Sequence, residues 1–237
     1  MRILAKTTLK DIIITLPDKK NLQFFIELLS DTLRFVEFSL SYKLGNMKIR
    51  LIGDRESVMQ SIETVKTLSR MFSTSVVPDK EGFYAHHLKL IQQVSTRIVS
   101  LESIATVLNV SGYSSRVIDQ TLISKAKIEE IKEIVLQLYE IIQQIPNNVR
   151  IQAMKRVILA VCYKTQFLPD FVIDKGLKNN YFREHNSSLS LTESPENVIV
   201  KLIDDLSKEE VKNEFNKNHL ENSVHSMKIL SRFIEDK

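Results

Sequence analysis

The sequence predicts an α+β protein in which a small sheet domain is followed by mostly helical units. Apolar and polar residues alternate over residues 36–51, which indicates a two-stranded hairpin with one buried face. Apolar residues recur every three or four positions over residues 22–33 and 58–72, which indicates amphipathic helices. After residue 83 helical spacing dominates, so most of the remaining chain is expected to be helical.

Length and composition favour several compact units. The 237 residues exceed one typical domain, and 43% hydrophobic with 26% charged residues is ordinary for a globular protein. Composition and turn-like stretches divide the chain into expected domains 1–76, 77–145 and 146–237. A single cysteine favours a reducing compartment. The sequence shows neither a signal peptide nor a membrane-spanning apolar run, which together predict a cytoplasmic protein without membrane association.

The N-terminal domain is predicted to follow the order β-α-β-β-α. Residues 9–16 are rich in β-branched side chains and end at Pro17, as is typical of a strand. A helix over 22–33 and a hairpin turning at Leu44-Gly45-Asn46 follow. The last helix carries its apolar stripe over 58–72. One sheet with both helices on the same face would bury all of these apolar positions together.

This domain resembles a KH domain, a small RNA-binding fold. The resemblance rests on the hairpin and closing helix, and on Ile49, Leu51, Gly53, Asp54 and Val58 at the strand–turn–helix junction. KH domains clamp the nucleic-acid backbone with a GXXG loop between two helices. The segment between the first two strands here has no glycine and room for only one helix, so that clamp is missing.

If the sheet binds nucleic acid, its polar face is the candidate surface. The basic residues there are Lys43, Lys48 and Arg50. The alternative is a solvated face that keeps the sheet soluble, because outward charged faces are the norm.

Residues 99–122 resemble a helix-turn-helix. Ile104, Ala105 and Leu108 would form the buried face of the first helix. The second helix would be anchored by Val117, Ile118 and Leu122. A DNA-reading helix needs a basic outer face, whereas Arg116 is the one basic residue in this stretch. A compact helical hairpin is therefore the favoured interpretation. A weak repeat at an offset of 55 residues aligns 104–122 with 159–177 and suggests two copies of one helical unit.

The third domain is predicted to be winged-helix-like and the more basic of the two helical units. No acidic residue lies between Glu140 and Asp170, and a polar hairpin over 181–192 follows two helices. Pro195 is expected to open a further helix, and 211–233 to form a C-terminal helix. Basic side chains would contact phosphates here without reading sequence. The candidates are Arg150, Lys155, Arg156, Lys164, Lys175, Lys178 and Arg183.

No residue pattern indicates catalysis, a metal site or a cofactor. His86 and His87 are adjacent but lack partner ligands at metal-binding spacing. Cys162 lies in an apolar helical stretch, where it is expected to be a buried small hydrophobe. No glycine-rich phosphate loop is present.

Across its length the chain also resembles an uncharacterised family of archaeal proteins. The resemblance rests on the KH-like start, the Gly112-Tyr113 pair after a short helix, and Ser124 ahead of a helix containing Glu129-Glu130. It implies a microbial cytosol and no particular activity.

The functional hypothesis is a non-enzymatic RNA-binding or ribonucleoprotein-associated protein with surfaces directed mainly at phosphates. A net charge of +4 and a pI near 9.0 permit such binding. One alternative is a DNA-binding regulator that uses the helix-turn-helix elements. The other is a protein-interaction scaffold without nucleic-acid contacts.

Overall fold

A computed structural model describes residues 7–16, 22–185 and 188–208. The fold is mixed α+β with small antiparallel sheets, as predicted. The chain folds as two compact units, Met1–Glu140 and Ile141–Lys237. The predicted domain boundaries at 76/77 and 145/146 stay predictions. None of the described helices is long and apolar enough to cross a membrane.

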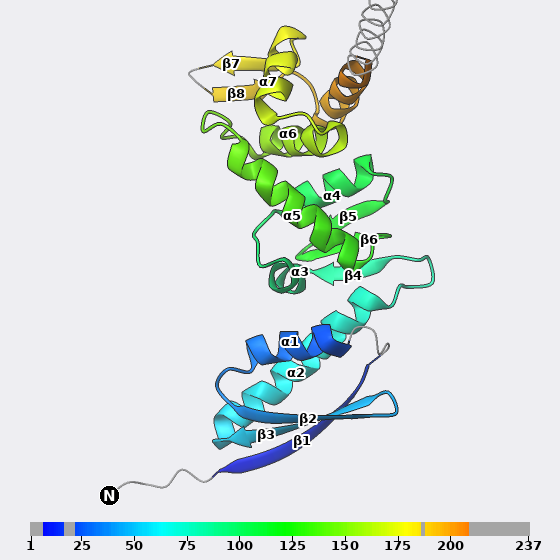
Figure 1. Cartoon of the computed structure of the whole chain (residues 1–237), viewed down its shortest axis with the longest axis vertical. Coiled ribbons are helices and arrows are strands. Elements are labelled where there is room, and N and C mark those ends of the chain that lie inside the picture. Colours follow the sequence, from blue (N-terminus) through cyan, green and yellow to red (C-terminus); the bar gives the residue numbers. More distant parts are fainter. Residues whose placement is uncertain (1–6, 17–21, 186–187, 209–237) are drawn as a thin grey trace, which may run out of the picture. The chain divides into compact units, whose positions relative to one another are not determined.

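The first five elements follow the predicted order. They are β1 (Thr8–Thr15), α1 (Leu22–Thr32), β2 (Glu37–Lys43), β3 (Asn46–Gly53) and α2 (Arg55–Val76). The strands form an antiparallel sheet in the order β1-β3-β2, and α1 and α2 cover one face of it (Figure 1). The hairpin between β2 and β3 turns at Leu44 and Gly45, which both have positive φ.

The core of this sheet layer contains the apolar positions that the sequence pattern marked. Met47, Ile49 and Leu51 point from β3 toward the helices and are at most 1% exposed. Phe25 of α1 lies against Phe72 of α2, with ring centroids 4.9 Å apart. Asp54 begins α2 by accepting a hydrogen bond from the backbone N–H of Ser57 at 2.9 Å.

A second small sheet lies within the same unit. Its elements are β4 (Tyr84–His87), α3 (Leu88–Ser95), α4 (Leu101–Val110), β5 (Ser115–Ile118), β6 (Thr121–Ser124) and α5 (Ile128–Gln144). The strands pair antiparallel in the order β4-β6-β5. The predicted first helix is confirmed as α4.

The predicted second helix, anchored by Val117, Ile118 and Leu122, is wrong, because these residues lie in the β5–β6 hairpin. Asn109 explains the turn into β5: its side chain accepts a hydrogen bond from the Ser115 N–H at 2.8 Å and donates one to the Ser115 carbonyl at 3.0 Å. Asp119, with positive φ, turns the chain between the two strands. A strand of four residues shows too few positions on each face to reveal its period in the sequence.

The second unit has two helices followed by a hairpin, in the predicted order. The elements are α6 (Gln152–Thr165), α7 (Pro169–Lys178), β7 (Phe182–His185) and β8 (Ser188–Leu191), and a further helix is described over 195–208. Helix α6 packs on α7 and β8, and α7 packs on β7. The winged-helix identification stays a prediction. The C-terminal helix predicted over 211–233 lies outside the described residues.

The aligned repeat does not correspond to one duplicated helical unit. Residues 104–122 contain most of α4 and part of the β5–β6 hairpin, whereas 159–177 contain parts of α6 and α7. The matching Val-Ile-Asp triplets therefore lie at the end of a strand in one copy and in a helix in the other. The prediction of two copies of one packing unit is wrong.

Candidate functional site

The outer face of the β1-β3-β2 sheet carries two of the predicted phosphate contacts, and both are engaged by one carboxylate. Asp11 on β1 lies 2.7 Å from Lys48 Nζ and 2.9 Å from Arg50 Nε. Hydrogen bonds from Arg50 and then Lys48 hold the pKa of Asp11 well below its usual range. The two cations are thus partly neutralised by a carboxylate that stays charged at physiological pH.

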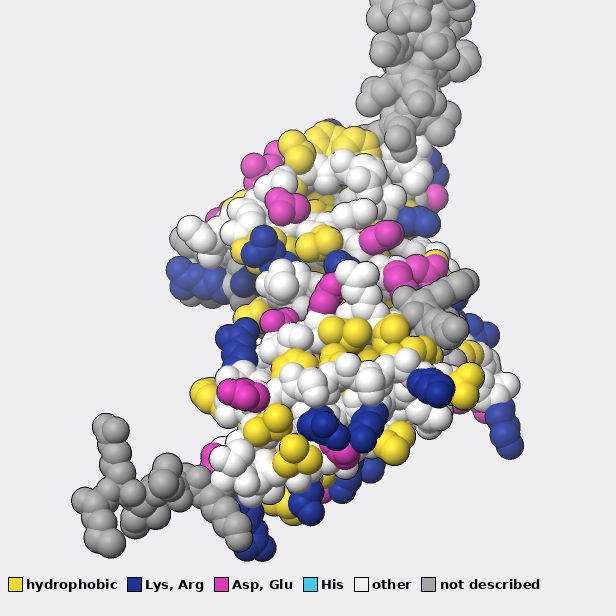
Figure 2. All heavy atoms as spheres, turned by 60° about the horizontal axis from the view of Figure 1, so that its bottom comes forward, with side chains coloured by type: hydrophobic (Ala, Val, Ile, Leu, Met, Phe, Trp, Pro, Cys, Tyr) yellow, Lys and Arg dark blue, Asp and Glu magenta, His cyan; other side chains and the backbone are white. Residues whose placement is uncertain are grey.

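The rest of this outer face offers limited chemistry for RNA. Lys43 lies at the end of β2 and is exposed. Leu9 and Ile13 are exposed on β1, at 53% and 68%. The strand residues on this face include no aromatic side chain, since Phe38 and Tyr42 point to the core. Figure 2 shows hydrophobic, basic and acidic side chains intermixed near the bottom of the view. The sheet therefore lacks the aromatic platform on which bases stack.

The second unit brings Arg150 and Lys155 together. Both line a hollow of about 300 Å³ next to Pro146 and Asn147, at the entrance to α6. Arg150 is exposed and Lys155 is half-buried. Neither lies within ion-pair distance of a carboxylate in the described part of the chain. Two unpaired cations at one opening form a suitable contact for a phosphate group.

The other predicted basic residues are distributed over three elements. Arg156 lies half-buried on α6, and Lys164 is exposed near its end. Lys175 and Lys178 lie in the last turn of α7, where cations also stabilise the carbonyl end of the helix. Arg183 is exposed on β7.

An aromatic pair at the start of α7 was not predicted from the sequence. The rings of Phe167 and Phe171 are stacked with centroids 4.8 Å apart, and Phe171 is 44% exposed. Phe171 and Lys175 are one helical turn apart, and Lys178 is one turn further along the same side. Asp170 and Asp174 lie on this helix too, so its surface is mixed in charge. In the sequence, the four-residue spacing of Phe167 and Phe171 next to Leu168 was the feature from which this pair could have been predicted.

The buried face of α7 explains why Phe171 points outward. Pro169, Val172, Ile173 and Gly176 are the buried positions of the helix. They follow a spacing of three or four residues and face the interior of the unit. Phe171 falls between them in the helical repeat, so it points away from that interior.

Helix α4 carries no basic residue among its ten, and its first turn contains Glu102. The basic groups nearby are used within the fold: Arg116 and Lys125 lie over the ring of Phe83, at 5.4 and 5.3 Å from its centroid. This region therefore offers few free basic side chains for contacts in a DNA major groove.

His86 and Cys162 have structural surroundings. His86 is fully buried, with Nδ1 2.5 Å from Ser75 Oγ and Nε2 2.9 Å from the Ala126 carbonyl. Burial lowers the pKa of His86 to about 4. Cys162 is buried as expected, and burial raises the pKa of its thiol to about 12. In the described part of the chain, His, Cys, Asp and Glu form no cluster that could hold a metal ion.

The fold and these surfaces define a mixed α+β protein with basic patches and small antiparallel sheets. Over residues 14–200 the sequence matches a family described as "Uncharacterized protein conserved in archaea (DUF2067)". The chain belongs to this archaeal family. It is also similar to "Uncharacterized protein MJ0388" of Methanocaldococcus jannaschii, with 20% identity over 160 residues, which cover 66% of this chain and 75% of that protein. No solved structure matches.

Proposed function

We propose that this protein is a non-enzymatic RNA-binding or ribonucleoprotein-associated protein whose main contact surface lies in the unit Ile141–Lys237. The observation that carries the proposal is the exposed Phe171 on the helix that also carries Lys175 and Lys178; its ring stacks on that of Phe167, which lies just before the helix. An aromatic side chain beside cations suits single-stranded RNA, because bases stack on the ring while phosphates contact the cations.

Two further features support this surface. The hollow lined by Arg150 and Lys155 offers a second phosphate contact in the same unit. The order α6, α7, β7, β8 agrees with a winged-helix interpretation, and the second helix of a helix-turn-helix is the one that usually meets nucleic acid. Phosphate contacts of this kind position a strand without specifying its sequence.

The KH-like sheet would contribute more weakly. Its cations Lys48 and Arg50 are shared with Asp11, so they attract phosphate less than unpaired cations do. The DNA-binding alternative has less support, because α4 lacks basic residues and the predicted second helix is a hairpin. The scaffold alternative is an outcome of the experiment below.

Fluorescence anisotropy of a labelled oligouridylate, titrated with the full chain at increasing KCl, tests the proposal. We expect saturable binding at low salt that weakens as salt rises. Replacing Arg150, Lys155 and Lys178 with alanine should flatten the slope of log K against log salt by about 0.7 for each phosphate that is no longer neutralised. Phe171→Ala should weaken binding by roughly 1–3 kcal/mol with an unchanged slope.

Lys80→Ala is the matched control, because Lys80 is an exposed lysine of the loop before β4. It should leave both affinity and slope close to those of the wild type. Absence of RNA binding at low salt would leave the scaffold alternative. Tighter binding to a defined DNA duplex than to single strands would favour the regulator.

A further inference from the structure

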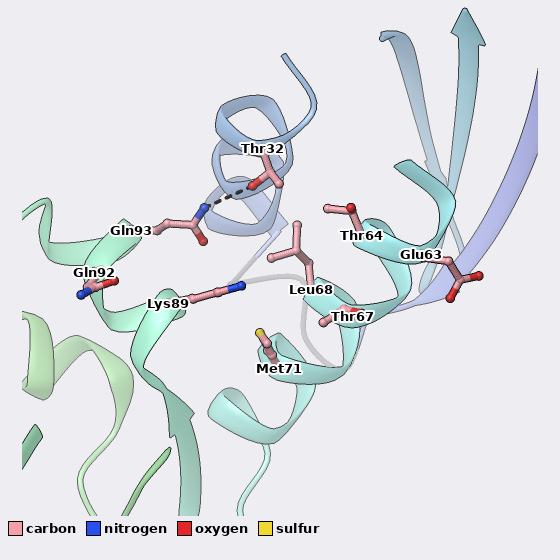
Figure 3. Close-up of a pocket in the computed structure, with 9 residues that line it drawn as sticks. All are labelled: Thr32, Glu63, Thr64, Thr67, Leu68, Met71, Lys89, Gln92 and Gln93. Carbon is pink, nitrogen blue, oxygen red and sulfur yellow. Dashed lines mark hydrogen bonds between the residues drawn. The ribbon is translucent and has the colours of Figure 1, made fainter. Parts of the chain in front are cut away.

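A pocket of about 510 Å³ lies in the first unit, where α1, α2 and α3 meet. Its volume is within the range of small-molecule sites. Leu68 and Met71 of α2 form an apolar wall, and polar side chains surround it (Figure 3). The polar lining residues are Thr32, Glu63, Thr64, Thr67, Lys89, Gln92 and Gln93.

Gln93 presents a fixed hydrogen-bond acceptor to this pocket. Its Nε2 donates to Thr32 Oγ1 at 3.2 Å, and the Thr32 hydroxyl in turn donates to the Leu28 carbonyl at 2.7 Å. This chain of hydrogen bonds sets the orientation of the amide, which leaves Oε1 on the other side. Gln93 Oε1 is buried and has no partner among the described residues. A buried acceptor without a partner favours a ligand that supplies an N–H or O–H group.

Lys89 supplies a positive charge to the same pocket. Figure 3 shows its side chain reaching from α3 toward α2, with the ammonium close to the space that Gln93 also faces. The lining carboxylate, Glu63, is paired with Lys66 at 2.8 Å. No described carboxylate lies within ion-pair distance of Lys89. Lys89 is therefore available to an anionic group of a ligand.

These three features together specify the chemistry of the ligand. It has an anionic group for Lys89, an N–H donor for Gln93, and a flat or apolar body for the wall of Leu68 and Met71. A nucleotide has all three, because its phosphate is anionic and its base combines a ring face with polar edges. The neighbouring amide of Gln92 adds a donor and an acceptor that can contact such an edge.

We propose that this pocket binds one nucleoside monophosphate unit, either as a free nucleotide or as a single residue of an RNA strand. The proposal is independent of the surface on α7, since the residues of the two sites belong to different units. Substitutions in one site therefore test it without altering the other.

Isothermal titration calorimetry of the full chain with uridine monophosphate (UMP), adenosine monophosphate (AMP) and uridine tests the pocket. We expect saturable binding of at least one of the two nucleotides. Lys89→Gln should weaken nucleotide binding by about tenfold and leave uridine unchanged, because uridine has no phosphate. Gln93→Leu should weaken nucleotide and nucleoside alike. Arg70→Gln, an exposed position of α2 outside the lining, is the control and should change neither.

Competition separates the two sources of the nucleotide. If an oligouridylate binds in a Lys89-dependent manner and UMP displaces it, the ligand is part of an RNA strand. If UMP or AMP binds and the oligouridylate does not compete, the ligand is free. The proposal is overturned if neither nucleotide binds saturably, if inorganic phosphate binds as tightly as they do, or if Lys89→Gln has no effect. Loss of RNA binding in the variants of the unit Ile141–Lys237, with intact UMP binding, would concern the proposed function alone.

Discussion

His86 shows how one buried polar side chain is accommodated in the first unit. The Nε2–H donates to the Ala126 carbonyl, and Nδ1 accepts from the Ser75 hydroxyl, so the neutral ring satisfies both partners. A second proton, on Nδ1, would displace the hydrogen bond that the Ser75 hydroxyl donates to this nitrogen. The resulting positive charge would lie in a buried site, away from water. The ring thus links α2, β4 and the residues before α5 as long as it is neutral.

The linkage predicts a pH dependence of stability. The pKa of His86 is about 4 in the folded protein and 6.5 in the unfolded chain, so the unfolded chain binds the proton first as pH falls. The free energy of unfolding should therefore decrease between pH 6.5 and pH 4, by about 3 kcal/mol from this residue. Urea unfolding of the wild type and of His86→Gln across this range measures the effect, because their carboxylates titrate alike.

The free energy of unfolding of the wild type should fall relative to that of His86→Gln as pH decreases from 7 to 4. His87→Gln is the control, since His87 is only partly buried and should show a smaller change. If the difference in free energy of unfolding between the wild type and His86→Gln stays constant from pH 7 to pH 4.5, the pKa of His86 is not lowered in the folded protein.

At the scale of elements, the contact between α7 and β7 depends on a glycine. Gly176 lies on the buried face of the helix, and a Cβ placed there would be 2.3 Å from the ring carbons Cδ2 and Cε2 of Phe182. Phe182 is only 3% exposed, so its ring cannot swing into solvent without opening the core. The close approach of helix and hairpin therefore requires a residue without a side chain.

Gly176→Ala should destabilise the protein, although alanine is the better helix former. Helix propensity alone would favour alanine by about 1 kcal/mol, whereas overpacking of a core costs about 1–3 kcal/mol. Denaturant unfolding should show a net loss. Gly53→Ala is the comparison, because its Cβ would meet Val36 Cγ1 at 3.4 Å, an ordinary contact. A Gly176→Ala variant as stable as the wild type would mean that the ring of Phe182 relaxes freely.

Element length explains which predictions succeeded. The first five elements have seven or more residues, and their period is visible in the sequence. The strands β5 and β6 have four residues each, and Val117, Ile118 and Leu122 fit a helical spacing as well as a strand. What makes them strands is the side chain of Asn109 and the pairing of β6 with β4, which is 30 or more residues away in sequence.

The whole molecule consists of two compact units, with the boundary falling within α5. Each unit has its own buried residues, such as Ile49 and Phe72 in the first and Val157 and Ile158 in the second. Units with separate cores are expected to unfold with some independence. A single unfolding midpoint would then describe neither of the two units.

Differential scanning calorimetry of the full chain should resolve two transitions. Ile49→Ala removes buried aliphatic carbons from the core side of β3. It should lower the midpoint temperature of one transition by roughly 5 °C or more. Gly176→Ala should lower the other. If both substitutions shift one common transition, the two units unfold as a single cooperative body.

The candidate surfaces were only partly visible in the sequence. The positions of Lys43, Lys48, Arg50 and the basic residues after Arg150 could be read from charge and period alone. Their partners could not, because Asp11 meets Lys48 and Arg50 only through the pairing of β1 with β3. The exposure of Phe171 and the pocket at Gln93 likewise depend on which face of each helix is covered by another element.

The α+β class, the order of the first five elements and the location of the basic segments could be predicted from the sequence alone. These properties follow from local periodicity and residue type, which need no knowledge of distant contacts. Only the folded chain shows that residues 115–124 form a hairpin, that one carboxylate engages two sheet cations, and that the buried Oε1 of Gln93 faces a pocket between helices. Each of these arises where segments far apart in the chain meet, and burial and hydrogen bonding there outweigh local preference.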